Sequence, residues 1–258
     1  MRALASMMAV QRSTIPSHLL PIQMFENMKP HLLAAFFLSQ IFAVSSSSGR
    51  EIDLGKPSAK IRRFISDVVF MVEAGDRERY SKRLPESIIV QYHGEVQPKA
   101  MAEKHLTEFC QIAGVKVTQG AFVQPPVAKV DIHFGPQAEL ARLAKEMDRQ
   151  ITLPLGYTFW IWWDEKRIID RAAVFLATDR LSDAALEDRY IELLLGVFGL
   201  PSHSKEYDES CLSTKEQVLT TLQPLDKAML EFVYRAVPAG TKQRDIDKIF
   251  EQEWLKKP

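Results

Sequence analysis

The sequence predicts an α+β protein in which a mixed, twisted sheet is backed by helices and followed by a helical C-terminal part. Segments rich in β-branched and aromatic residues alternate with amphipathic segments, but without the regular spacing of βαβ units. The last third of the chain is mostly helical in pattern. With 258 residues, 46% hydrophobic and 26% charged, the chain is long enough to bury one sizeable core.

Six segments have the β-branched and aromatic content expected of strands. In residues 128–134 apolar and polar side chains alternate, so one face should be buried and the other, which carries His133, should be exposed. Residues 157–163 and 168–177 flank an Asp-Glu-Lys turn, which predicts a hairpin. The other predicted strands are residues 62–74, 87–93 and 115–118.

The strongest predicted helix begins at Asp183. Its apolar residues recur at steps of three and four, Gly199 should end it as the residue after the C-cap, and Pro201 prevents a restart. A second strong helix begins at Pro224 and places Asp226 in its first turn, near the positive end of the helix dipole. Helices are also expected at residues 98–113, 136–147 and 244–257.

Charge and motif content exclude two classes of ligand. Lysine and arginine together number 33, as do aspartate and glutamate, and the basic residues are scattered. This balance gives no net field that would attract nucleic acid or an anionic membrane, so we expect no nucleic-acid partner. No glycine-rich phosphate loop follows a predicted strand, so nucleotide binding has no support.

The N-terminal region has the pattern of a signal peptide. Met28, Lys29 and Pro30 precede an apolar run of about a dozen residues that ends with the small residues Ala43 and Ser45. The run is shorter than the roughly 20 residues that a membrane span needs. We therefore expect a true start near Met28, a signal peptide within residues 1–45, a flexible leader at 46–59, and an exported, periplasmic or secreted protein without a membrane span in the mature chain. The alternative is a buried N-terminal helix.

The two cysteines, Cys110 and Cys211, are candidates for a disulfide. An exported protein meets an oxidising compartment, in which a pair of cysteines is commonly bridged. The alternative is that Cys110 is a small core residue of its helix. The sequence does not decide between the two, because it does not give the distance between them.

The helix that ends at Gly199 is followed by a helix that begins near Asp226 and ends with Tyr234. This arrangement resembles the metzincin zinc peptidases, whose helix carries His-Glu-x-x-His-x-x-Gly-x-x-His and which have a later helix with an Asp and a Tyr. The resemblance implies a metzincin-like domain over residues 60–242, followed by a helical tail at 243–258. The corresponding motif positions are Glu192, Leu193, Gly196, Gly199 and Ser202.

The chemistry of the metzincin motif is missing at these positions. A catalytic zinc needs about three side-chain ligands and an open position for water. Gly196 stands where the second histidine is expected and offers no donor, and Ser202 stands at the third. Leu193 takes the place of the general base and cannot accept a proton. We therefore expect neither a metal nor another cofactor.

A closer resemblance rests on three further stretches. They are residues 60–64 (Lys-Ile-Arg-Arg-Phe), residues 190–204 with their Gly-Leu-Pro, and residues 222–240. Together they resemble a bacterial family of exported proteins known as domain of unknown function number twenty-nine twenty-seven. That resemblance implies a metzincin-like shell with replaced zinc ligands. Many members carry a second Glu and a Gln where Leu193 and Gly196 stand here, so this chain departs further from an active site.

These observations favour a binding role over catalysis. A metzincin-like shell without metal would keep a cleft beside a sheet edge, which could take an extended peptide as an added strand. The expected partner is therefore an extended peptide or a protein of the cell envelope. The alternative is a hydrolase or peptidase with an unconventional site that uses Glu192 and His203. If these residues have no such role, we expect Glu192 to be an exposed helix carboxylate and His203 an exposed loop histidine. A third class is a structural component of the envelope.

Overall fold

The computed structural model describes residues 2–4, 58–70, 79–118, 127–254 and 256. Of the predicted signal peptide only residues 2–4 are described, and the predicted leader up to residue 57 lies outside these ranges. The chain divides into two units, and every described residue belongs to the unit formed by Met1–Ser6 and Leu54–Pro258. No helix among the described residues has the length and apolar character needed to cross a membrane.

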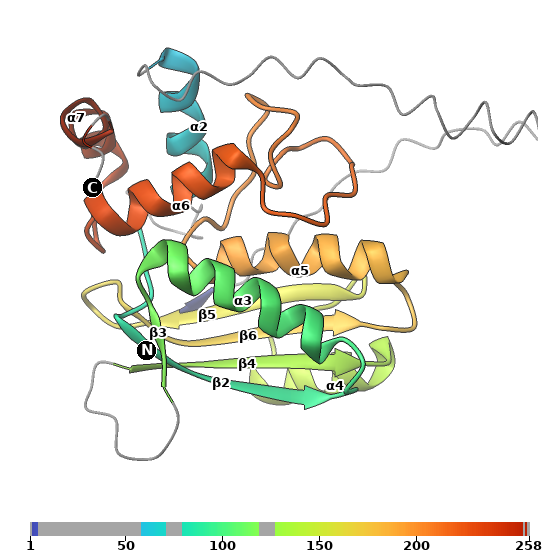
Figure 1. Ribbon diagram of the computed structural model, residues 1–258. Helices are drawn as coiled ribbons and strands as arrows, with labels where there is room; N and C mark the ends of the chain where they lie inside the picture. The colour runs from blue at the N-terminus through green and yellow to red at the C-terminus, as the bar shows by residue number, and fades with distance from the viewer. Residues whose placement is uncertain (1, 5–57, 71–78, 119–126, 255, 257–258) are drawn as a thin grey trace, which may run out of the picture. The chain divides into compact units, whose positions relative to one another are not determined.

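The described part contains a six-stranded mixed sheet with the order β1-β5-β6-β4-β2-β3 (Figure 1). β2 pairs in parallel with β3 and β4, and β4 pairs in parallel with β6, whereas β5 is antiparallel to both β6 and β1. This arrangement confirms the predicted α+β class with a mixed sheet; the metzincin-like character stays a prediction. The strands are β1 (Arg2–Leu4), β2 (Ser87–Gly94), β3 (Lys116–Val117), β4 (Val127–Gly135), β5 (Tyr157–Trp163) and β6 (Ile169–Ala177).

Helices cover both faces of this sheet (Figure 1). α3 and α5 lie on one face, and α4 packs on the other through a cluster that includes Leu140, Trp160 and Phe175. The α4 face is covered mainly at β5 and β6, which supply the strand residues of that cluster. The helices are α2 (Ala59–Val69), α3 (Lys99–Ala113), α4 (Gln137–Met147), α5 (Asp183–Val197), α6 (Pro224–Ala236) and α7 (Ile246–Glu253), the last preceded by a 3₁₀ turn at Gln243–Asp245.

The strand predicted at residues 62–74 is wrong, because residues 59–69 form α2. The Ser58 side chain caps this helix by accepting a hydrogen bond from Ile61 N at 3.1 Å. The buried residues recur at steps of three and four, as on one helix face. This period outweighs the β-branched content that suggested a strand. The buried residues of α2 are Ile61, Phe64, Ile65, Val68 and Val69.

The exposed position predicted for His133 is also wrong. His133 is only 6% exposed, because its ring is stacked between those of His93, 4.5 Å away, and Phe175, 5.0 Å away. Asp131, on the same side of β4, is 2% exposed. Polar residues of this strand therefore lie beneath neighbouring side chains on the α4 face of the sheet.

The C-terminal segment is helical, as predicted, but it is packed onto the domain. Ile246, Phe250 and Trp254 are buried, and the last two contact Phe232 of α6 edge to face. Such aromatic contacts add to the stabilisation that the buried area itself provides. Residues 246–254 therefore complete the core near α2 and α6.

Candidate functional site

The end of α5 is held by a Schellman motif. Gly199 has a φ of +93°, its N–H donates to Gly196 O, and the N–H of Leu200 donates to Leu195 O at 2.9 Å. A Cβ at Gly199 would lie 2.2 Å from Lys82 O, so only glycine allows this close approach. The predicted helix end is confirmed, and it fixes the direction in which residues 200–204 leave the helix.

The two residues of the alternative catalytic prediction meet at this end of α5. His203 Nε2 lies 3.1 Å from Glu192 Oε1, and Arg189, one turn earlier, forms an ion pair with the other carboxylate oxygen. The side chains of Glu192 and His203 are 12% and 17% exposed, so neither is the surface group first considered. Arg189 also lies over the ring of Tyr157 of β5, 5.2 Å from its centroid. We call Arg189, Glu192 and His203 the α5 ion cluster.

Charge pairing in the α5 ion cluster keeps Glu192 ionised. Burial by itself raises the pKa of Glu192, but the hydrogen bond from His203 and the charge of Arg189 outweigh it and leave the pKa below its usual value. Burial lowers the pKa of Arg189, but the charge of the adjacent Glu192 outweighs burial and leaves this pKa above its usual value. A general base that works near neutral pH needs a raised pKa, so this environment suits an ion pair better than proton transfer.

Gly196, where the metzincin resemblance predicts the second metal ligand, lies against the ring of a residue of the sheet. A Cβ at Gly196 would lie 2.5 Å from the ring of Phe159 of β5, which therefore packs directly on the helix backbone. Glycine at this position lets α5 approach the sheet closely. No group of three or more His, Cys, Asp or Glu side chains within the described ranges is arranged to hold a metal ion.

The remaining motif positions have structural contacts. Leu193 is buried in the core. Ser202 donates its N–H to Val68 O at 3.3 Å and its hydroxyl to Phe70 O at 3.5 Å, which ties this loop to the end of α2. Among the positions considered from the sequence, the structure thus joins Glu192 to His203 but directs Ser202 elsewhere.

Helix α6 places Asp226 and Tyr234, the two residues that the sequence analysis singled out on it, in the core. Asp226 is fully buried and accepts hydrogen bonds from Ser210 Oγ and from Cys211 N at 2.8 Å. Burial raises the pKa of Asp226 even though these bonds act against it. Tyr234 accepts a hydrogen bond from Leu84 N at 3.2 Å. Asp226 thus binds the loop that precedes α6, and Tyr234 binds the segment that contains Leu84.

The two cysteines are free thiols in this structure. Cys110 is buried on α3, and burial raises its pKa to about 11. Cys211 lies in the loop before α6, where its Sγ contacts Thr221 O at 3.6 Å. The bridge considered from the sequence is not formed, and Cys110 is the core residue of the alternative prediction.

The edge of the sheet beside α5 carries an extended strand. β1 pairs antiparallel with β5, with Arg2 opposite Trp163 and Leu4 opposite Ile161. Residues 157–160 of β5 have no strand partner on this side within the described ranges. The edge of β5 is therefore a place where an extended segment is accepted by backbone pairing.

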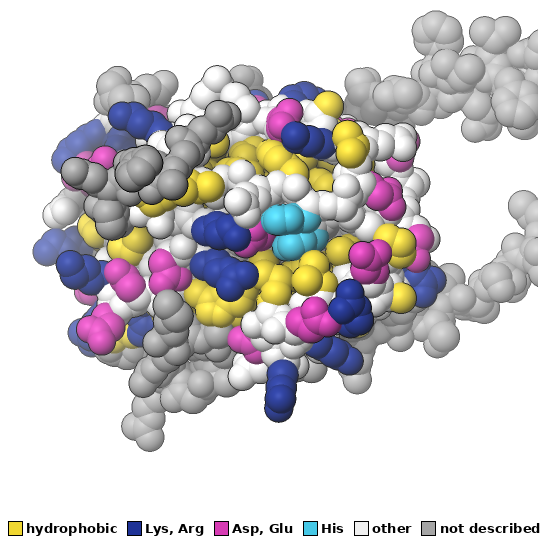
Figure 2. All heavy atoms as spheres, turned by 90° about the horizontal axis from the view of Figure 1, so that it is seen from below, with side chains coloured by type: hydrophobic (Ala, Val, Ile, Leu, Met, Phe, Trp, Pro, Cys, Tyr) yellow, Lys and Arg dark blue, Asp and Glu magenta, His cyan; other side chains and the backbone are white. Residues whose placement is uncertain are grey.

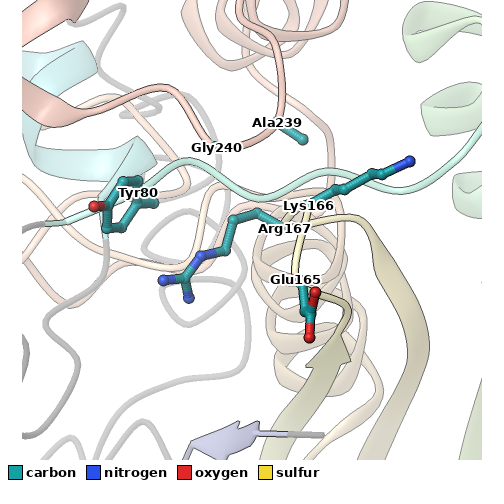
Figure 3. Close-up of a pocket in the computed structure, with 6 residues that line it drawn as sticks. All are labelled: Tyr80, Glu165, Lys166, Arg167, Ala239 and Gly240. Atoms are coloured by element: carbon teal, nitrogen blue, oxygen red, sulfur yellow. The ribbon is translucent and has the colours of Figure 1, made fainter.

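A pocket of about 420 Å³ lies next to the β5–β6 turn, between that turn and the loop that follows α6 (Figure 3). It is lined by Tyr80, Glu165, Lys166, Arg167, Ala239 and Gly240. Arg167 has a φ of +65°, as the last residue of the hairpin turn, and lies over the ring of Tyr80. The pocket is shallow and open, and none of the residues predicted as a site contributes to it.

Sequence reasoning did not find a second polar cluster, on the α4 face of the sheet. It joins His93 of β2, Lys129, Asp131 and His133 of β4, and Arg171 of β6. The alternation in residues 128–134 was a partial signal, since it placed three of these residues on one side of a strand. The pairing of β2 with β4, which brings His93 opposite His133, is a long-range contact that no local pattern reveals.

Comparison with known proteins leaves the family open, because no protein-family model and no curated protein matches this chain.

Proposed function

We propose that this chain is an exported member of the domain-of-unknown-function family named above, with a metal-free, metzincin-like fold, and that it binds an extended peptide along the edge of β5. The observation that carries the proposal is the antiparallel pairing of β1 with β5. It supports an edge whose backbone groups have the geometry to receive another strand. The partner would be an extended peptide or a segment of an envelope protein, in the periplasm or outside the cell.

The predicted processing of the N-terminus gives this edge a role. A start near Met28 or cleavage near Ser45 would each leave Ile161–Trp163 without residues 2–4 as their partner strand. An unpaired edge presents a row of N–H and C=O groups that pair readily with another extended chain. The exported chain would therefore present this edge of β5 for binding, without the strand that covers it in the full sequence.

The experiment compares a chain that begins at Ser46 with a synthetic peptide of residues 1–8. We expect the peptide to bind and to change the fluorescence of the tryptophans on β5, equally with and without a chelator. Peptides with Ala3→Pro or Leu4→Pro test the pairing, since adjacent strand residues point their N–H groups to opposite sides and proline removes that donor. At least one of them should bind markedly less well than a matched Ala3→Gly peptide. Equal binding of all four peptides, or binding that the chelator abolishes, would contradict the proposal.

A second candidate function, hydrolysis at the α5 ion cluster, is favoured by one observation: His203 and Glu192 are in contact at 3.1 Å. Metal analysis of the purified chain and a peptidase assay of Glu192→Ala and His203→Ala separate the two functions. Peptide binding predicts no stoichiometric metal and no turnover in any variant. Turnover lost in both variants would favour hydrolysis instead.

A further inference from the structure

The α4 face of the sheet holds a cationic site that the proposed peptide edge does not use. We name it the sheet-face site and define it as His93, Lys129, Asp131, His133 and Arg171. Figure 2 views the molecule from this side and shows histidine side chains next to lysine and arginine side chains near the middle of the face. These side chains come from three neighbouring strands of the sheet, β2, β4 and β6.

Two permanent cations lie side by side in this site. Lys129 of β4 and Arg171 of β6 are directly opposite each other in the parallel pair, so their side chains project from the same face. Their side chains are 48% and 41% exposed. Like charges on adjacent strands repel each other unless an anion lies between them. Arg171 is further held by Trp162, opposite it on β5, with the guanidinium 4.8 Å from the ring centroid.

The site contains only one carboxylate for these cations. Asp131 Oδ1 lies 3.1 Å from Lys129 Nζ and 3.0 Å from His93 Nε2, and Asp131 Oδ2 lies 3.7 Å from Arg171. Burial alone would raise the pKa of Asp131, but His93 and Lys129 outweigh it and lower the pKa, so the carboxylate is ionised. One negative charge shared by two permanent cations leaves a surplus of one positive charge.

A buried polar ring without a hydrogen-bond partner among the described residues lies beside His93. His133 is 6% exposed, and neither of its ring nitrogens has a hydrogen-bond partner in the described structure. Leaving such groups unpaired in a buried place is destabilising. An apolar side chain would fill the same space, between His93 and Phe175, without that cost. Unsatisfied buried polar groups of this kind are rare, and this one borders the proposed site through its stacking on His93.

We propose that the sheet-face site binds an anionic group, a carboxylate or a phosphate, between Lys129, Arg171 and the exposed His93. Arginine and lysine together provide the charge-assisted hydrogen bonds that such oxygens accept, and the strands hold these donors in place before the ligand arrives. Asp131 orients His93 and competes with the ligand for the same cations. The inference does not depend on the peptide edge, which lies on β5.

The test uses the full chain and two probes, inorganic phosphate and succinate, titrated at constant pH and constant chloride. The readout is the NMR signal of the ring protons of His93 and His133, assigned with His93→Gln and His133→Phe. We expect a saturable shift with a dissociation constant on the order of millimolar, a range typical of weak sites. Saturation by phosphate alone, by succinate alone or by both supports the site and identifies which group it takes.

Charge variants decide whether these residues form the site. Lys129→Gln and Arg171→Gln should each weaken binding about tenfold, the loss of one charge-assisted hydrogen bond. Asp131→Asn should tighten binding, because it removes the competing carboxylate. The matched control is Arg142→Gln, an exposed arginine on α4 paired with Glu146, which should change nothing. Shifts that rise linearly with both probes, or an equal loss in Arg142→Gln, would overturn the proposal.

Discussion

At the scale of residues, Glu192 links the end of α5 to the loop that follows it. Its carboxylate is shared between Arg189 on the same helix and His203 beyond Gly199. A paired and hydrogen-bonded carboxylate of this kind stabilises the fold only as long as both partners remain, because removing one leaves a buried charge uncompensated. The α5 ion cluster therefore has a structural role that does not require catalysis.

We predict that Glu192→Gln lowers the free energy of unfolding by about 1–3 kcal/mol at pH 7. The pKa of Glu192 is lowered in the folded chain, so its contribution is complete above the usual glutamate value of about 4.3 and is lost as the pH falls through the folded value. Urea unfolding at several pH values should show the difference between the two chains shrinking below about pH 4. Glu146→Gln, at an exposed carboxylate, is the control; a difference independent of pH would contradict the assignment.

We predict that His133 makes the protein sensitive to mild acid. Burial, together with the nearby charges of His93, Arg171 and Lys129, lowers the pKa of His133 from 6.5 to about 4, with Asp131 acting against them. Between these values the unfolded chain binds a proton that the folded chain does not, so stability falls as the pH drops from about 6.5 to about 4, by roughly 1–3 kcal/mol.

The variant His133→Phe checks this prediction, because it keeps a ring between His93 and Phe175 but cannot be protonated. Urea unfolding between pH 7 and pH 4 should show a smaller loss of stability in the variant than in the original chain. Identical slopes in the two chains would show that His133 is not the group responsible.

The residues of the two polar clusters differ in how far the sequence predicted them. Glu192 stood out as a carboxylate within an apolar helix, and His203 lies just past the glycine that ends it, so local pattern was enough to suggest both. Their contact follows from the Schellman turn at Gly199. His93 and Asp131 could not be paired in advance, because the register of β2 against β4 is set by packing far away in sequence.

At the scale of elements, two helices end with a glycine of positive φ but in different surroundings. Gly114, after α3, has a φ of +67° and open space where a Cβ would lie. Gly199, after α5, has a φ of +93° and the Lys82 carbonyl at that position. The first glycine serves only the turn, whereas the second also lets the segment that includes Lys82 pack against the end of α5.

We predict that Gly199→Ala is more destabilising than Gly114→Ala. The left-handed conformation alone costs a non-glycine residue about 1–2 kcal/mol, which is the effect expected at Gly114. At Gly199 the clash with Lys82 O should add roughly 1–3 kcal/mol, the range for overpacking. Thermal unfolding of the two variants measures the difference. Equal midpoints would mean that the contact with Lys82 relaxes without cost.

Most elements were predictable where one period dominated. The hairpin of β5 and β6 and the helices α3 to α6 follow their local patterns closely. α2 did not, because Ile61, Ile65, Val68 and Val69 fit both a β-rich composition and a helical period. Ser58 at the N-cap was the local signal that favoured the helix.

At the scale of the whole domain, the described unit is a sheet with helices on both faces and an edge of β5 that accepts a strand. α5 lies against this strand through the contact of Gly196 with Phe159, so a larger side chain at position 196 would meet that ring. The function proposed for this edge is the binding of an extended chain by backbone pairing.

The most direct test of this account is amide hydrogen exchange in the chain that begins at Ser46. We expect the outward-facing amides of residues 159–163 to exchange rapidly in the free chain, because no strand covers them. The peptide of residues 1–8 should slow their exchange, with or without a chelator. Amides of β5 that are unaffected by the peptide, or that are protected only when a metal ion is present, would contradict the account.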